Sequence, residues 1–149
     1  MASIAYYLLD TTTTGLGTSF DNLQRIEHLM KQANAIAPNS AVVLNWTLFW
    51  LSMMGRCPEV IEMAQHAINA DPNQLTGVYN ELGKCKTQTG HAEEEIPLQA
   101  TADRRNPRSS YKFRRYNRMG FASLMLGRDQ DAIEFYRRSL AMNREEGSV

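Results

Sequence analysis

The sequence predicts an all-α fold, a right-handed helical solenoid of about four stacked helix pairs. A short apolar pattern occurs three times, each time followed by a glycine at a turn. Tyr79 opens one copy, Tyr116 opens the next 37 residues later, and Leu44 opens another 35 residues earlier. A self-similarity of this length is typical of units that bury their apolar faces only by stacking on their neighbours.

Composition limits the class of protein. The 149 residues suffice for one domain, and 16 Lys and Arg balance 16 Asp and Glu, so no overall field attracts nucleic acid or anionic lipid. The longest apolar run, residues 41–54, is interrupted and too short to cross a bilayer. The N-terminus lacks the pattern of a signal peptide. We therefore expect a soluble, cytoplasmic protein.

The two cysteines, Cys57 and Cys85, lie in helices of different predicted repeats. Their spacing matches no metal-ligand motif. We interpret both as free thiols in a reducing compartment.

The first repeat, residues 2–40, is degenerate. Residues 2–13 are expected to form a helix that ends in a run of threonines followed by glycines. Asp21 opens a clearer helix, because the apolar residues behind it are spaced three and four apart. Pro38 ends that helix.

The second repeat, residues 41–73, is delimited by residues that suit helix ends. Ser40 can cap the first helix by accepting a hydrogen bond from a free backbone amide. Gly55 then turns the chain. Pro58 suits the first turn of the second helix, where its missing amide costs nothing.

The third repeat, residues 74–108, contains predicted helices at about 74–89 and 91–105, separated by Gly90. Pro97 falls inside the second of these helices, and its ring would clash with the preceding turn. A kink or a late helix start is expected there.

The fourth repeat covers residues 109–143, with Ser109 or Ser110 as the expected cap. Its helices are expected at about 110–126 and 129–143. Residues 144–149 are expected to form a frayed tail.

These positions resemble the tetratricopeptide repeat (TPR) family over about residues 41–143. Two closely packed helices need a hydrogen or methyl side chain where they cross, and the third and fourth repeats place glycine there. The second repeat departs from the pattern with Leu48, which is expected to widen that pair locally. The matching residues are Gly55, Ala67 and Pro72 in the second repeat, Leu82, Gly83, Gly90, Ala102 and Pro107 in the third, and Tyr116, Met119, Gly120, Gly127, Ala132 and Tyr136 in the fourth.

A weaker likeness concerns residues 94–98, 127–133 and 137–140. They are similar to C-terminal TPR segments of bacterial class III adenylate or guanylate cyclases and of winged-helix transcription regulators. The likeness implies a regulatory segment of a bacterial signalling protein. This sequence has no catalytic or DNA-binding region, so it would be a fragment or a stand-alone relative.

The TPR resemblance implies that the first helices of the pairs line a concave groove that binds a peptide or a partner domain. Asn45, Asn80 and Asn117 occupy equivalent places on these helices. A side-chain amide both donates and accepts hydrogen bonds, which suits it to the backbone of an extended peptide. The alternative is that asparagine is simply tolerated there.

One turn further along lie Phe49, Lys84 and Phe121. They could form a mixed apolar floor for an amphipathic partner, or the two phenylalanines could be core contacts between repeats. Trp46 and Trp50 are expected to pack inside.

Seven of the fifteen residues 104–118 are basic, with aromatic residues between them. Cations beside stacking rings can bind nucleic acid. The alternative is a solvated face, salt-bridged in part to Asp103 and to the glutamates 93–95.

Arg114 and Arg118 also resemble the last two cationic positions of the carboxylate clamp by which some TPR proteins hold a chaperone tail. The other clamp places hold Asn45, Phe49 and Glu81 instead of the expected residues. The sequence therefore indicates at most an acidic partner group near the two arginines.

We find no phosphate-binding loop, no paired nucleophile and base and no metal motif, so catalysis, cofactors and metals are not expected. The sequence predicts a protein-interaction scaffold. Self-association through the end helices or residues 2–40, and nucleic-acid contact through residues 104–118, remain alternatives. The predicted groove residues are Asn45, Phe49, Asn80, Lys84, Arg114, Asn117, Arg118 and Phe121.

Overall fold

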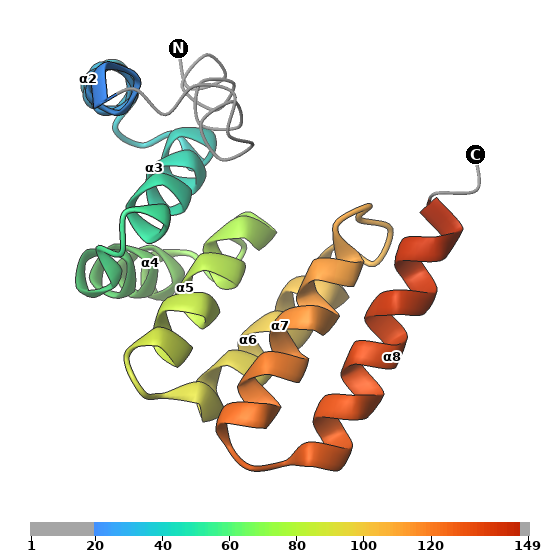
Figure 1. Ribbon diagram of the computed structural model, residues 1–149. Coiled ribbons are helices and arrows are strands. Elements are labelled where there is room, and N and C mark those ends of the chain that lie inside the picture. The colour runs from blue at the N-terminus through green and yellow to red at the C-terminus, as the bar shows by residue number, and fades with distance from the viewer. Residues whose placement is uncertain (1–19, 147–149) are drawn as a thin grey trace. The chain divides into compact units, whose positions relative to one another are not determined.

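The computed structural model describes residues 20–146, with side chains from 23 to 142, and every regular element in that part is a helix (Figure 1). The expected helix at residues 2–13 lies outside the described part. The helices are α2 (Phe20–Ile36), α3 (Ala41–Met53), α4 (Cys57–Ala70), α5 (Thr76–Gln88), α6 (Ala92–Arg105), α7 (Lys112–Met125) and α8 (Asp129–Glu146).

The chain divides into two compact units, Met1–Trp50 and Leu51–Val149. Helix α3 begins in the first unit and ends in the second.

The first unit packs α2 against α3. Ile26, Met30 and Trp50 form its buried centre, with Trp46 among the partly buried side chains around them. Asn34 joins the two helices, because its Nδ2 donates to Thr47 Oγ1 at 2.9 Å. The expectation that both tryptophans pack inside is confirmed.

Three helix ends share one geometry. Gly55, Gly90 and Gly127 have φ angles of 72°, 91° and 68°, a left-handed conformation that L side chains rarely adopt. At each, the amide of the following residue donates to the carbonyl five residues back, as Arg56 N does to Leu51 O at 2.9 Å. This Schellman pairing satisfies carbonyls that the helix end leaves free. The turn positions predicted from the repeat are therefore confirmed.

Helices α5, α6, α7 and α8 of the second unit pack in sequence order, α5 on α6, α6 on α7 and α7 on α8 (Figure 1). Gly83 and Gly120 lie where the paired helices approach. A Cβ on Gly120 would come within 2.9 Å of the Tyr136 ring, and one on Gly83 within 3.3 Å of Gln99 Nε2 and Glu95 Cγ. The close approach inferred from the small residues is present in both pairs.

Some local expectations need correction. Helix α6 begins at Ala92 and runs unbroken through Pro97, so there is no late start. Ser109 does not cap α7: its hydroxyl accepts from Tyr111 N at 3.2 Å, in a turn ahead of the helix, and Tyr111 takes the cap position without a side-chain bond. The last helix continues to Glu146, past its expected end at residue 143.

The cysteine interpretation was wrong. Cys57 and Cys85 form a disulfide, with Cα atoms 5.0 Å apart, that joins the start of α4 to α5. The two cysteines belong to different repeats, and stacking brings them together by placing α4 directly against α5. A disulfide is typical of oxidising compartments, so it removes one argument for a cytoplasmic location.

Candidate interaction surface

Helix α7 keeps one apolar stripe open to solvent. Phe121, Leu124 and Met125 are 41%, 48% and 60% exposed. Asn117 lies four residues before Phe121, and Leu124 and Met125 lie three and four residues after it, so all four share one side of the helix. The opposite side of the same helix is buried, with Met119 at 4% and Ala122 at 0%. The stripe is therefore the part of α7 that packing against α6 and α8 leaves uncovered.

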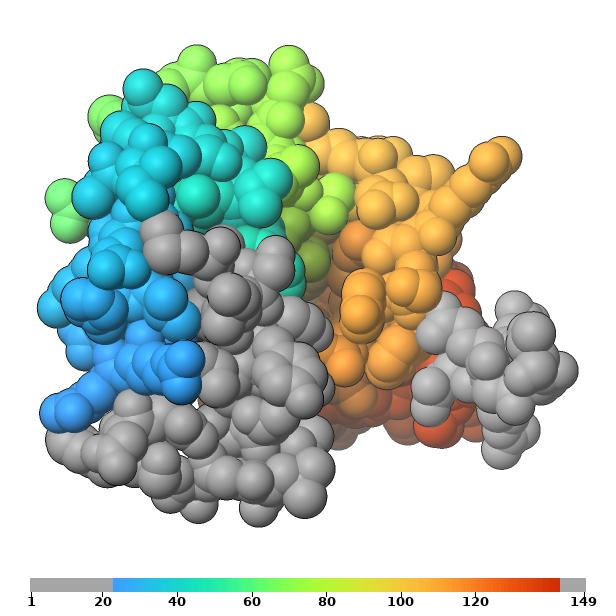
Figure 2. Space-filling model, turned by 90° about the horizontal axis from the view of Figure 1, so that it is seen from above, coloured from blue at the N-terminus to red at the C-terminus, as the bar shows by residue number. Residues whose placement is uncertain are grey.

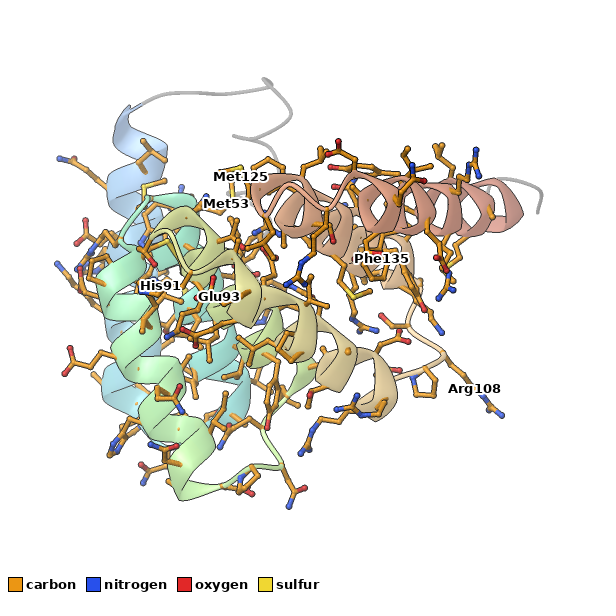
Figure 3. The ribbon with its side chains drawn as sticks, turned by 90° about the horizontal axis from the view of Figure 1, so that it is seen from below. Met53, His91, Glu93, Arg108, Met125 and Phe135 are labelled. Carbon is orange, nitrogen blue, oxygen red and sulfur yellow. A yellow bond between two sulfur atoms is a disulfide. The ribbon has the colours of Figure 1, made fainter. Side chains whose placement is uncertain are left out.

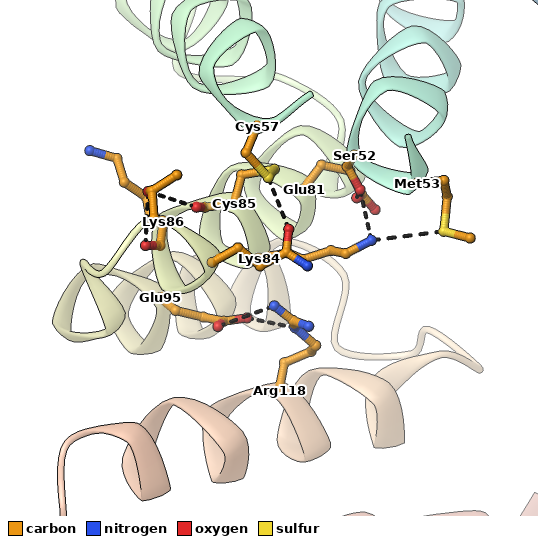
Figure 4. The surroundings of a disulfide bond; sticks show 11 residues. Ser52, Met53, Cys57, Glu81, Lys84, Cys85, Lys86, Glu95 and Arg118 are labelled. Atoms are coloured by element: carbon orange, nitrogen blue, oxygen red, sulfur yellow. Dashed lines mark hydrogen bonds and ion pairs between the residues drawn. A yellow bond between two sulfur atoms is a disulfide. The ribbon is translucent and has the colours of Figure 1, made fainter. Parts of the chain in front are cut away.

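Helix α5 contributes polar groups next to α7, which it also contacts directly. Asn80 is half-buried, and its Oδ1 has no hydrogen-bond partner among the described residues. An unpaired buried amide oxygen costs free energy. Lys84 Nζ donates to Ser52 Oγ at 2.8 Å and lies 3.8 Å from Met53 Sδ (Figure 4).

Glu81 and Lys84 are both half-buried, and partial burial disfavours their charged forms. Burial raises the pKa of Glu81 above 4.5, although the hydrogen bond from Ser52 opposes this by favouring the charged form. Burial also lowers the pKa of Lys84 below 10.5, while the Glu81 carboxylate opposes it. The positive charge of Arg118 lowers the pKa of both groups, as a smaller effect than burial.

Arg118 already has an internal partner. Its Nε and Nη2 donate to the two oxygens of Glu95 at 2.7 and 3.3 Å, and the Glu95 side chain is fully buried (Figure 4). Thr87 Oγ1 and Gln99 Nε2 also donate to that carboxylate. The pair ties α6 to α7, and removing one partner of such a buried pair costs about 3–5 kcal/mol.

The two groove residues of the first unit have different environments. Phe49 packs against the core around Trp50, and its ring lies 6.0 Å from that of Trp46 in an edge-on arrangement. Asn45 is half-buried. The core alternative for phenylalanine therefore fits Phe49, whereas Phe121 is exposed.

The carboxylate clamp gains no support. Arg118 is occupied by Glu95, and Arg114 stacks on aromatic rings, with its Cζ 5.0 Å from the Tyr111 centroid. Glu81, at a third clamp place, is a half-buried acid instead of a basic or amide residue. The expected partners of the basic cluster are found instead, because Glu95 and Asp103 both pair with it.

Two features of this surface escaped sequence reasoning. Leu124 belongs to the α7 stripe, and its position three residues after Phe121 was the available signal. The Ser52–Glu81–Lys84 cluster joins residues up to 32 positions apart, which no local pattern reveals.

Within the described residues, no group of three or more His, Cys, Asp or Glu side chains is placed to hold a metal ion. No helix there is long and apolar enough to cross a membrane.

Comparison with known proteins identifies the fold. No family model and no curated protein matches the sequence. Among solved structures, a thermophilic TPR protein of Thermus thermophilus is similar with a TM-score of 0.71 at 16% identity, over 95% of this chain and 74% of its own.

Two structures of a protein named MamA are also similar. MamA AMB-1 has a TM-score of 0.67 at 16% identity, over 97% of this chain and 80% of its own. MamA MSR-1 has a TM-score of 0.64 at 14% identity, over 98% and 79%. With its helix pairs, turn glycines and close crossings, the chain has the all-α helical-repeat fold of tetratricopeptide repeat proteins.

Proposed function

We propose that this protein is a non-catalytic interaction module that binds a protein segment on the first helices of its repeats. The observation that carries the proposal is the exposed stripe Phe121, Leu124 and Met125 on α7. Aromatic and methionine side chains are typical anchors of protein interfaces. The fold supports the same class of function by analogy only.

The polar residues beside the stripe suit the backbone of the bound segment. Asn117 is exposed on α7, and Asn80 on α5 is half-buried. Together they offer both donors and acceptors to an extended peptide. Lys84 and Arg118 are held by internal partners and would act mainly by charge.

Peptides selected from a displayed random library against the wild-type protein test the proposal. Their affinities are then measured by fluorescence anisotropy for Phe121→Asp/Met125→Asp and for Asn80→Ala/Asn117→Ala. We expect losses of about tenfold or more, because each change removes an anchor or a backbone hydrogen bond. The control Ile133→Asp/Leu140→Asp alters exposed apolar residues of α8.

The control should bind as the wild type does, and circular dichroism should show equal melting temperatures for all variants. Peptides that bind all four proteins equally would rule out this surface. A lower melting temperature with intact binding would make the two asparagines structural.

A finer proposal concerns the larger context. The likeness of residues 127–133 to cyclase-associated repeats supports a regulatory segment in a bacterial signalling protein. Reading the coding sequence upstream of Met1 tests it, since a cyclase or DNA-binding region there is the expected finding.

Self-association is a second candidate, favoured by helix α8. Ile133 and Leu140 lie two turns apart and are 45% and 59% exposed. Such a face can pair with the same face of a second copy. Light scattering should then give a mass that rises with concentration and falls back in Leu140→Asp. A constant monomer mass would exclude it.

A further inference from the structure

A basic edge lies at one end of the second unit, where α6 ends and α7 begins. Its cations come from the last turn of α6, the connecting loop and the first turn of α7. They are Arg104, Arg105, Arg108, Lys112, Arg114 and Arg115. Figure 3 shows Arg108 pointing away from the protein, and in Figure 2 the orange region that includes this loop lies open on the face seen from above.

Two of these cations serve the fold. Asp103 pairs with Lys112 and with Arg115, each at 3.3 Å. Arg115 is 3% exposed and also donates to Asn106 O at 3.1 Å. The carboxylate of Asp103 is thus already paired with two cations of the same protein.

The other four arginines form no ion pair with any residue whose side chain the structure describes. Arg104 donates to Thr101 Oγ1 at 2.9 Å, and Arg105 donates to Asn73 Oδ1 at 3.3 Å. Both partners are neutral, so the positive charges are not compensated. The edge is a concentration of charge on a chain whose net charge is zero.

Aromatic rings hold two of the four guanidinium groups in place. Arg105 Cζ lies 5.1 Å from the centroid of Tyr79, which is buried and whose hydroxyl donates to Pro72 O. Arg114 Cζ lies 5.0 Å from the Tyr111 centroid and 5.8 Å from that of Phe113. A guanidinium stacked on a ring keeps N–H donors in its plane for a carboxylate, and less side-chain entropy is lost on binding.

The helix dipoles favour the arginines at the end of α6 but not the arginine at the start of α7. Arg104 and Arg105 lie at the C-terminus of α6, where cations are favourable. Arg114 lies at the N-terminus of α7, whose first turn has no acidic residue, and there a cation is unfavourable. An anion bound at the edge would remove that cost.

We infer that the basic edge is a second docking site, separate from the α7 stripe, that binds an Asp- or Glu-rich segment of a protein partner. Planar guanidinium groups match carboxylates through paired hydrogen bonds. Four uncompensated arginines suit a short acidic segment, whereas tight nucleic-acid binding relies on neutralising many phosphates and on a strong basic field. The inference does not depend on the proposed peptide site.

A labelled glutamate-rich peptide titrated by fluorescence anisotropy against the full chain tests this at low salt. Arg105→Gln/Arg108→Gln/Arg114→Gln should weaken binding by about tenfold or more. The control Arg25→Gln/Arg128→Gln/Arg137→Gln removes the same charge from exposed arginines elsewhere and should change affinity less than about twofold. Arg108→Gln/Arg114→Gln leaves the contact of Arg105 with Tyr79 intact and should show an intermediate loss.

A matched peptide with glutamine in place of glutamate should not bind. Equal losses of affinity in Arg105→Gln/Arg108→Gln/Arg114→Gln and in the control would overturn the inference, because binding would then follow net charge alone. Absence of binding to the wild type would also overturn it. A single-stranded oligonucleotide of equal charge serves as the alternative ligand. If it bound more strongly than the glutamate-rich peptide, and if Arg105→Gln/Arg108→Gln/Arg114→Gln abolished that binding, the inference of an acidic protein segment would be wrong and the edge would bind nucleic acid.

Discussion

At the scale of single residues, the glycines are required for two different reasons, and two acidic side chains differ in how their burial is offset. Gly120 is needed for space, because a methyl group would touch the Tyr136 ring, whereas Gly55, Gly90 and Gly127 are needed for their backbone conformation. Glu95 is fully buried and Glu81 is half-buried. Only Glu95 has an arginine bound directly to its carboxylate, which offsets the cost of burial.

Gly120→Ala should lower the free energy of unfolding by about 1–3 kcal/mol, because the new methyl group overlaps the Tyr136 ring. In a Tyr136→Leu background the same change should cost less or stabilise, since alanine is the better helix former. Urea unfolding of the four proteins measures this. An equal loss in both backgrounds would mean that the ring is not the obstacle.

Glu81→Gln should change the pH dependence of stability. Because the pKa of Glu81 is raised in the folded state, its contribution is fully present below pH 4.5 and is lost as the pH rises through the folded pKa. The wild type should therefore lose stability relative to Glu81→Gln as the pH rises from 4.5 toward neutrality. Ser52→Ala removes a hydrogen bond to the charged form and should widen that window. Denaturant unfolding across this range would show parallel curves if Glu81 were well solvated.

At the scale of the elements, neighbouring helices are joined by specific cross-links as well as by packing. The disulfide joins α4 to α5, Glu95 and Arg118 join α6 to α7, and Ser139 Oγ on α8 donates to Phe113 O on α7 at 2.8 Å. Alanines fill much of the interior between them. Such small side chains bury little area each, so the cross-links matter more.

Reduction of the disulfide should lower stability by about 3–4 kcal/mol, the loop-closure entropy expected for a 28-residue separation. Figure 4 shows the surroundings of the disulfide. Cys57 Sγ lies 2.9 Å from Gln88 Oε1, so the thiol formed by reduction would have a hydrogen-bond acceptor within reach. Thermal unfolding with and without reductant measures the effect, and Cys57→Ser/Cys85→Ser should not respond to reductant. Two free thiols by mass spectrometry in the oxidised protein would contradict the bond.

At the scale of the whole molecule, the sequence repeat continues along the chain, but the chain divides into two compact units. The division at Trp50 falls inside α3, within the second predicted repeat, so units of sequence and units of packing differ. In a linear array each helix contacts only its neighbours, and cooperativity can therefore break between them. The single domain expected from the sequence remains a prediction.

Trp46 and Trp50 are the only tryptophans of the sequence, and both belong to the first unit. Tryptophan fluorescence should therefore report its unfolding, while far-ultraviolet circular dichroism follows mainly α4–α8. We expect the fluorescence transition at a lower urea concentration, because the smaller unit buries less surface. Coincident transitions would indicate one cooperative domain.

Local sequence patterns were enough to predict the helices, the turns between them and the type of repeat. These follow from local chemistry: apolar spacing, glycines that accept a positive φ and small residues at helix crossings. The sequence also indicated that acidic residues of α6 would pair with the basic cluster. Local patterns predict the structure within one helix pair, but not the contacts between side chains of different pairs.

Which side chains remain available to a partner depends on the packing of the helices against one another. Arg118 turns to Glu95, Lys84 to Ser52 and Phe49 to the core, while Phe121 stays exposed. Each of these outcomes depends on a residue in a different helix, as does the pairing of the two cysteines. Whether a charge or a ring meets a partner is set by how helices stack, and that arrangement is not encoded in the spacing along any one of them.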